Sequence, residues 1–127
     1  MNVLQPKELW EETGRWQEAD EILYKLKDKS GKDITLAPTH EEQVTNIIKH
    51  HTSSYKDLPF SLYQFQTKFR HEARAKSGLL RGREFLMKDM YSFHLDDDDF
   101  NRYYDKVKKA YLKVFDRVGL KAIIVAA

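Results

Sequence analysis

The chain contains 127 residues, of which 41% are hydrophobic and 33% charged, and its formal net charge is +2. This composition is typical of one soluble globular domain, and the length allows a buried core without metal or disulfide crosslinks. The absence of cysteine excludes disulfides, thiol catalysis and thiolate zinc sites. The sequence contains neither an apolar run long enough to span a membrane nor the pattern of a signal peptide, so we predict a cytoplasmic protein.

The first third of the chain predicts a short helix followed by an antiparallel hairpin. Pro6 suits the start of a helix and Gly14 suits its end, so the predicted helix covers residues 6–14. Residues 21–28 and 34–37 are rich in strand-forming side chains and flank a Lys-Ser-Gly-Lys-Asp turn. We therefore expect these two segments to pair as antiparallel strands.

A second helix and a second hairpin follow. Thr39 and Glu42 have the spacing of a capping box ahead of apolar residues with helical periodicity, which predicts a helix with Thr39 as its N-cap. Residues 61–71 alternate between mainly aromatic and mainly polar side chains, the pattern of a half-buried strand. A loop containing Gly78 separates this segment from residues 83–93, which we predict to be its partner strand.

The last third predicts a long amphipathic helix and a final strand. Four aspartates, Asp96 to Asp99, precede apolar residues spaced by three and four, and Gly119 is placed to end the helix. Residues 120–127 form an apolar run typical of a buried strand. Because both ends of the chain are abrupt, we expect it to be a piece of a longer one. The element order predicts an α+β fold, in which a largely antiparallel sheet is flanked by helices.

Charged side chains concentrate on the second hairpin, with one aromatic ring among them. They are Lys68, Arg70, Glu72, Arg81, Arg83, Glu84 and Asp89, and the ring is Phe85. Guanidinium groups grip phosphate oxygens bidentately, and a carboxylate accepts hydrogen bonds from an amino group. This pattern favours an anion site, although a polar sheet face that is merely open to water shows the same alternation. The five histidines and the aspartate run lack the spacing of a metal site, so we predict none within the chain.

Two sequence patterns in this hairpin resemble a known family. The segment FRHE at residues 69–72 and the segment RGREFLMKD at residues 81–89 resemble motif 2 of the class II aminoacyl-tRNA synthetases. Within that class, TLAPTHEE at 35–42 and MKDMYSFH at 87–94 resemble the bacterial type of prolyl-tRNA synthetase, and LQPKELWEETGRW at 4–16 resembles the segment after motif 1. The related threonyl enzymes resemble the chain less, because their amino-acid pocket uses a zinc site.

The resemblance implies a role for each of several residues in activating proline with ATP and transferring it to tRNA(Pro). Arg70 is the expected catalytic residue, which binds the α-phosphate and the proline carboxylate. Glu72 is expected to contact the adenine amino group, Arg81 the terminal phosphates, and Phe85 the adenine ring. The last set of implied residues binds proline and consists of Thr39, Glu41 and Arg70.

The resemblance also implies which parts of the full-length protein are not in this chain. Residues 1–127 correspond to part of the catalytic domain, whereas the motif 1 helix, motif 3, any editing insertion and the anticodon-binding domain are not in this chain. The implied Mg²⁺ ligands lie mainly outside it, the full-length protein is expected to be a homodimer, and the segment alone is expected to be inactive. Two alternatives stay open: a stand-alone synthetase-like paralogue that acts as a nucleotide-binding, RNA-binding or regulatory module, and a basic hairpin that binds nucleic acid through its phosphates.

Overall fold

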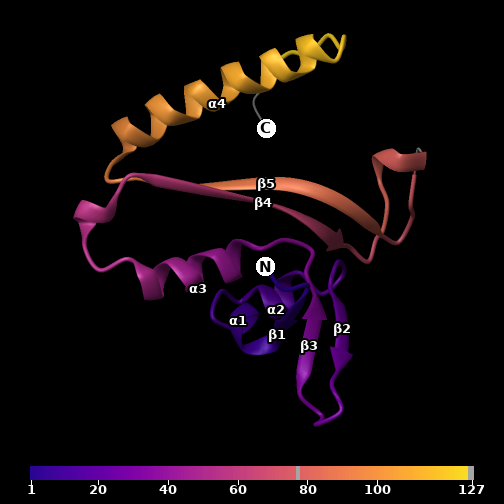
Figure 1. Cartoon of the computed structure of the whole chain (residues 1–127). Helices are drawn as coiled ribbons and strands as arrows, with labels where there is room; N and C mark the ends of the chain where they lie inside the picture. The colour runs from indigo at the N-terminus through magenta and orange to yellow at the C-terminus, as the bar shows by residue number, and fades with distance from the viewer. Residues whose placement is uncertain (77, 126–127) are drawn as a thin grey trace. The chain divides into compact units, whose positions relative to one another are not determined.

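The computed structural model describes residues 1–76 and 78–125. They form two compact units, of which the first comprises residues 1–53, 61–76 and 78–91 and the second residues 54–60 and 92–125. The expected α+β class is confirmed, since the chain combines helices with sheets whose strands pair as antiparallel neighbours (Figure 1). The described strands form two sheets, one of three strands and one of two, whereas the sequence pattern predicts a single sheet.

The three-stranded sheet has the order β1-β3-β2 (Figure 1). Its strands are β1 (Leu4–Pro6), β2 (Tyr24–Lys27) and β3 (Asp33–Leu36), which confirms the predicted first hairpin. The turn between β2 and β3 is closed by Asp28, whose carboxylate accepts hydrogen bonds from the amides of Ser30 and Lys32. Such a local side-chain bond is the typical way in which aspartate stabilises a turn.

Two short helices follow β1 and carry the core of the first unit. They are α1 (Lys7–Glu11) and α2 (Arg15–Glu18), separated by Gly14, whose φ of +74° is a conformation that favours glycine. Trp10, Trp16 and Leu23 pack together as a buried cluster. The predicted helix start at Pro6 is confirmed to within one residue, but the sequence did not indicate the second short helix.

The second hairpin is the two-stranded sheet of β4 (Phe60–Phe69) and β5 (Glu84–Phe93). Helix α3 (Glu41–His51) precedes it, followed by the one-turn helix η1 (Tyr55–Asp57), and another one-turn helix, η2 (Gly78–Leu80), lies in the hairpin loop. The side chains of β4 alternate between more buried and more exposed positions as predicted, but the polar face of the strand is the buried one. Lys68 is fully buried, whereas Tyr63 and Phe65 are 66% and 68% exposed.

The second unit is built around α4 (Asp97–Arg117), the predicted long helix. Asp96 is its N-cap and accepts a hydrogen bond from the Asp99 amide at 2.8 Å. At the other end, Gly119 has a φ of +76°, and the amide of Leu120 donates to the Phe115 carbonyl, the pattern of a Schellman motif. Residues 120–125 form no strand, which corrects the prediction for that part of the run, and residues 126–127 lie outside the described residues. A strand requires a pairing neighbour, and no described residue pairs with this segment.

Candidate active site

The hairpin places Arg70 beside the loop that joins β3 to α3. The amide of Phe69 donates to the Ala37 carbonyl at 2.9 Å, which ties the end of β4 to the end of β3. One residue further on, Arg70 donates from Nε to the Pro38 carbonyl at 3.2 Å. The guanidinium of Arg70 is therefore anchored on one side and lies against the start of the predicted proline-binding segment.

The four side chains predicted to bind ATP line one cavity of about 370 Å³. They are Arg70, Glu72, Arg81 and Phe85. The Arg70 guanidinium lies over the Phe85 ring at 5.3 Å, a cation–π distance that fixes both groups. The cavity thus combines two cations, one carboxylate and an aromatic face, which are complementary to the phosphates, the amino group and the ring of a nucleotide.

Arg83 holds the base of the hairpin loop and not the cavity. The Arg70 amide donates to the Arg83 carbonyl at 2.9 Å, and Arg83 Nε donates to the Glu72 carbonyl at 2.9 Å. These bonds extend the pairing of the two chain segments beyond the ends of β4 and β5. They keep Glu72 next to Arg70 in the lining of the cavity.

The capping-box prediction for α3 is wrong. The helix begins at Glu41, its N-cap is His40, and no side chain caps it. The Thr39 hydroxyl instead donates to the Glu41 carboxylate. Because the helix starts one residue later than predicted, Glu42 occupies the second helical position, from which it does not reach back to Thr39.

Glu42 is engaged by a different partner. Its side chain is 2% exposed and accepts a hydrogen bond from Arg15 of α2 at 2.6 Å. Glu41 is exposed and hydrogen-bonds only Thr39 among the described side chains. The two adjacent glutamates therefore differ in environment, since Glu42 joins two helices and Glu41 is open to a ligand.

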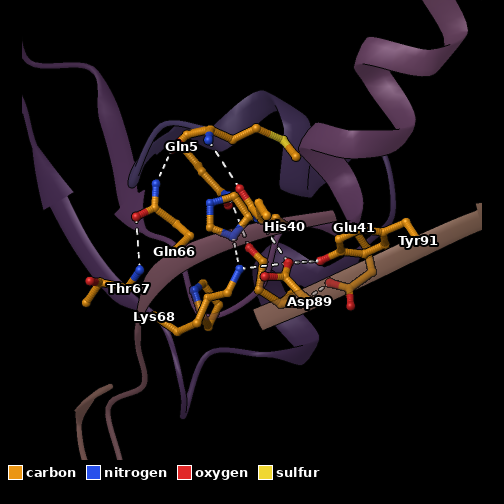
Figure 2. A network of polar contacts seen from close by, with 12 residues as sticks. Gln5, His40, Glu41, Gln66, Thr67, Lys68, Asp89 and Tyr91 are labelled. Atoms are coloured by element: carbon orange, nitrogen blue, oxygen red, sulfur yellow. Dashed lines mark hydrogen bonds and ion pairs between the residues drawn. The ribbon is translucent and has the colours of Figure 1, made fainter. Parts of the chain in front are cut away.

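A buried polar network lies between the β3–α3 loop and the hairpin (Figure 2). At its centre is Lys68, whose ammonium contacts the His40 ring and donates to the Asp89 carboxylate at 3.0 Å. The same carboxylate oxygen accepts from Gln64 at 3.0 Å and from the Tyr91 hydroxyl at 2.6 Å. A buried ammonium requires this kind of paired and hydrogen-bonded surrounding.

The network shifts the titration of its members in consistent directions. Burial opposes ionisation of Asp89, but hydrogen bonds from Gln64, Tyr91 and Lys68 outweigh it and hold the pKa of this carboxyl below its usual range. Burial, and then the positive charge of Lys68, lowers the pKa of His40. Burial and the hydrogen bond to Asp89 raise the pKa of Tyr91, as does the charge of Glu41. At neutral pH, the structure thus holds Asp89 ionised and His40 and Tyr91 uncharged.

This network was not predictable from the sequence pattern, although two of its residues stand at positions that the pattern singles out. Asp89 belongs to the motif 2 pattern, and Lys68 lies two residues before Arg70 on the same strand face. The pattern did not reveal that this face is the buried one. No sequence signal marks His40 beyond its being one of five scattered histidines, and the structure shows it fully buried.

Residues 1–76 and 78–125 contain neither a metal-site cluster nor a membrane-spanning helix. No group of three or more His, Asp or Glu side chains there has the arrangement of a metal site. None of the helices in that part of the chain is long and apolar enough to cross a bilayer.

Curated relatives match the chain over nearly its whole length. It is 56% identical over 125 residues to the proline–tRNA ligases of Arthrobacter sp. strain FB24 and Paenarthrobacter aurescens strain TC1, and 49% identical over 125 residues to that of Sulfurihydrogenibium sp. strain YO3AOP1. These matches cover 98% of this chain but only 21% or 22% of the relatives. The chain therefore spans about a fifth of the length of the curated relatives it matches.

Solved structures and a family model agree on the fold. Giardia lamblia prolyl-tRNA synthetase in complex with prolyl-adenylate superposes with a TM-score of 0.81 at 21% identity, covering 91% of this chain and 24% of that one. The RNA-binding domain of Cryptosporidium parvum threonyl-tRNA synthetase gives 0.82 at 23% identity, covering 94% and 30%. The model of the tRNA synthetase class II core domain (G, H, P, S and T) matches residues 24–127. The chain therefore belongs to the class II tRNA synthetase core-domain family.

Proposed function

We propose that this chain is the part of a proline–tRNA ligase that binds ATP and proline for the synthesis of prolyl-adenylate, from which the prolyl group passes to tRNA(Pro). The observation that carries the proposal is that four side chains line the same cavity. They are Arg70, Glu72, Arg81 and Phe85. The identity of 56% to named proline–tRNA ligases supports the choice of amino acid.

The proposed chemistry requires charge neutralisation more than a protein nucleophile. An oxygen of the proline carboxylate forms a bond to the α-phosphorus of ATP, and the bond from that phosphorus to pyrophosphate breaks. The attacking carboxylate is already ionised, so no general base is needed. Arg70 stabilises the negative charge that develops on the α-phosphate, and its bond to Pro38 pre-orients the guanidinium for this task.

Arg81 and Glu72 hold the two ends of ATP in this proposal. Arg81 binds the terminal phosphates, and the Glu72 carboxylate accepts hydrogen bonds from the adenine amino group. Phe85 lines the same cavity and stacks on the adenine ring. The Phe85 ring also contacts the Arg70 guanidinium.

Thr39 and Glu41 form the proposed receptor for the secondary ammonium of proline. The exposed Glu41 carboxylate supplies the compensating charge, and the Thr39 hydroxyl holds that carboxylate in place. Arg70 lies next to Pro38 and reaches the carboxylate of the same amino acid. Opposite charges at opposite ends of the site suit a small zwitterion.

The remaining components belong to the same proposal. Mg²⁺ accompanies ATP, and the described residues of this chain do not fit a magnesium site, so we assign its ligands to other parts of the ligase and derive no step from it. The proposed partners are tRNA(Pro) and a second copy of the ligase, and the proposed location is the cytoplasm. The domain boundaries inferred from the resemblance likewise stay a proposal, in which residues 1–127 are one part of the catalytic domain.

The decisive experiment uses a chimera in which this chain replaces the aligned 125 residues of the Arthrobacter ligase. Exchange of labelled pyrophosphate into ATP is measured with proline, threonine and no amino acid. Proline-dependent exchange near the rate of the parent ligase supports the proposal, and exchange that does not depend on proline in a cooperatively melting chimera contradicts it. The alternative of a regulatory or nucleic-acid-binding module is not favoured by the comparisons, and it predicts ATP binding that random oligonucleotides displace.

A further inference from the structure

Buried polar side chains hold the loop that carries Thr39 and Glu41, the proposed proline receptor. Gln5 is fully buried and donates to the Thr39 carbonyl at 3.1 Å. His40, between Thr39 and Glu41, is also fully buried, and its Nε2 lies 3.1 Å from the Asn2 carbonyl. The exposed receptor therefore rests on side chains that cannot contact a ligand in solvent.

Lys68 determines the state of His40. The lysine ammonium is a donor only, so the His40 Nδ1 that it contacts must be the acceptor. The proton of the neutral ring then lies on Nε2 and is donated to Asn2. Lys68 thus fixes both the tautomer and the orientation of the residue between the two receptor side chains.

Lys68 also acts on the hydrogen bond made by Tyr91. Together with Gln64 and Tyr91, its ammonium holds the Asp89 carboxylate ionised, and an ionised carboxylate only accepts. The Tyr91 hydroxyl must therefore donate to Asp89, so its oxygen is left as an acceptor toward its other neighbour, the Thr39 side chain. The labelled Tyr91 and Glu41 side chains lie close together in Figure 2. The buried cation thus contacts His40 directly and Tyr91 through Asp89, and both residues adjoin the receptor.

We propose that Lys68 is a positioning residue of the amino-acid site, which holds the Thr39–Glu41 segment and the Tyr91 hydroxyl in the geometry that binds a secondary ammonium. The inference rests on the proposed function and extends it to a side chain that touches neither substrate. Its partners His40 and Asp89 transmit the effect, whereas the nucleotide cavity has no contact with the Lys68 ammonium among the described residues.

The test is the substrate dependence of pyrophosphate exchange in the chimera described above. Lys68→Met removes the cation and keeps the length and apolar stem of the side chain. We expect the KM for proline to rise at least tenfold while the KM for ATP stays within twofold. A lysine that only supported the fold would lower the active fraction and hence kcat, and it would not raise one KM selectively.

A second variant guards against failure to fold. Lys68→Met alone leaves Asp89 without its cation, whereas Lys68→Met combined with Asp89→Asn removes both buried charges and lowers that risk. The matched control is Lys88→Met, the same substitution at an exposed position of β5, where the ammonium lies over the Tyr63 ring at 5.6 Å. We expect the double variant to retain the melting temperature better than Lys68→Met and still to show the selective rise in the KM for proline.

Three outcomes overturn the inference. A KM for proline within twofold of the unsubstituted chimera, in either Lys68 variant that folds, shows that Lys68 does not position the site. Equal rises in the KM for proline and for ATP, or a matching effect of Lys88→Met, show a general effect on structure. Absence of proline-dependent exchange in the unsubstituted, cooperatively melting chimera overturns the proposed function and this inference with it, so the two failures are distinguishable.

Discussion

The ion pair between Arg15 and Glu42 should respond asymmetrically to removal of its two partners. Glu42 is 2% exposed, and its second carboxylate oxygen has no hydrogen-bond partner among the described residues, so Arg15 is its main source of compensation. The Arg15 side chain is 35% exposed and can regain water. Arg15→Ala therefore leaves a buried carboxylate without a compensating charge, whereas Glu42→Ala leaves an unpaired cation that water can reach.

The magnitudes follow from this difference in exposure. Loss of one charge-assisted hydrogen bond with a partner that rehydrates costs about 1.5 to 2 kcal/mol for Glu42→Ala. An uncompensated buried carboxylate costs about 3 kcal/mol or more for Arg15→Ala. For a chain of this length, the first change lowers the melting temperature by about 5 to 8 °C and the second by about 10 °C or more. The double variant should melt above Arg15→Ala, because it contains no stranded charge.

Thermal unfolding at neutral pH, followed by circular dichroism, gives the melting temperatures of the unsubstituted chain, the two single variants and the double variant. The exposed neighbour provides the matched control, since Glu41→Ala should change stability by less than about 1 kcal/mol. In the chimera, Glu41→Ala should have the larger effect on substrate use, although Glu42→Ala has the larger effect on stability. Glu41→Ala should raise the KM for proline at least tenfold, while Glu42→Ala leaves it within threefold. An Arg15→Ala protein that melts at or above Glu42→Ala would refute the reasoning about the buried carboxylate.

Three further predictions test other parts of the molecule. Arg70→Ala in the chimera should lower proline-dependent pyrophosphate exchange at least tenfold, about 1.4 kcal/mol or more, and a rate within twofold of the unsubstituted chimera contradicts its catalytic role. Asp96→Ala should destabilise α4 by about 1 kcal/mol through loss of its N-cap, measured as helical circular dichroism on heating; an unchanged transition would contradict this role. Because the pKa of His40 is lowered on folding, the unfolded chain binds a proton that the folded chain does not, and the free energy of unfolding should fall as the pH drops below about 6.5. Urea unfolding at pH 7.5 and 5.5 checks this, and His40→Gln should reduce the pH dependence.

Elements with a clear periodicity were predictable from the sequence, and elements defined by their partners were not. The hairpin of β2 and β3 and the helix Asp97–Arg117 have the repeats of two and of three to four that those structures require. Strand β1 has only three residues and owes its pairing to β3, so no local pattern indicates it. The start of α3 was misplaced by one residue because a capping-box spacing does not reveal the competing bond between Thr39 and Glu41.

The candidate site divides in the same way. The residues lining the cavity stand in a motif, so their spacing along two paired strands allowed them to be grouped before their positions were known. The alternation of β4 identified two faces but not which of them is buried. Lys68 is tolerated inside because Asp89 and His40, distant in sequence, meet it there, and such compensation is a tertiary property.

The burial of both tryptophans gives the chain a localised optical probe. Trp10 and Trp16 are the only tryptophans in the sequence, and both lie in the core of the first unit, where the Trp10 indole N–H donates to Gln5 at 2.8 Å. Emission excited at the red edge of indole absorption therefore reports on that unit, while α4 contributes mainly to the far-ultraviolet dichroism. Recording both signals during one denaturant titration separates the unfolding of the two units without any label, because independent units would give transitions that do not coincide.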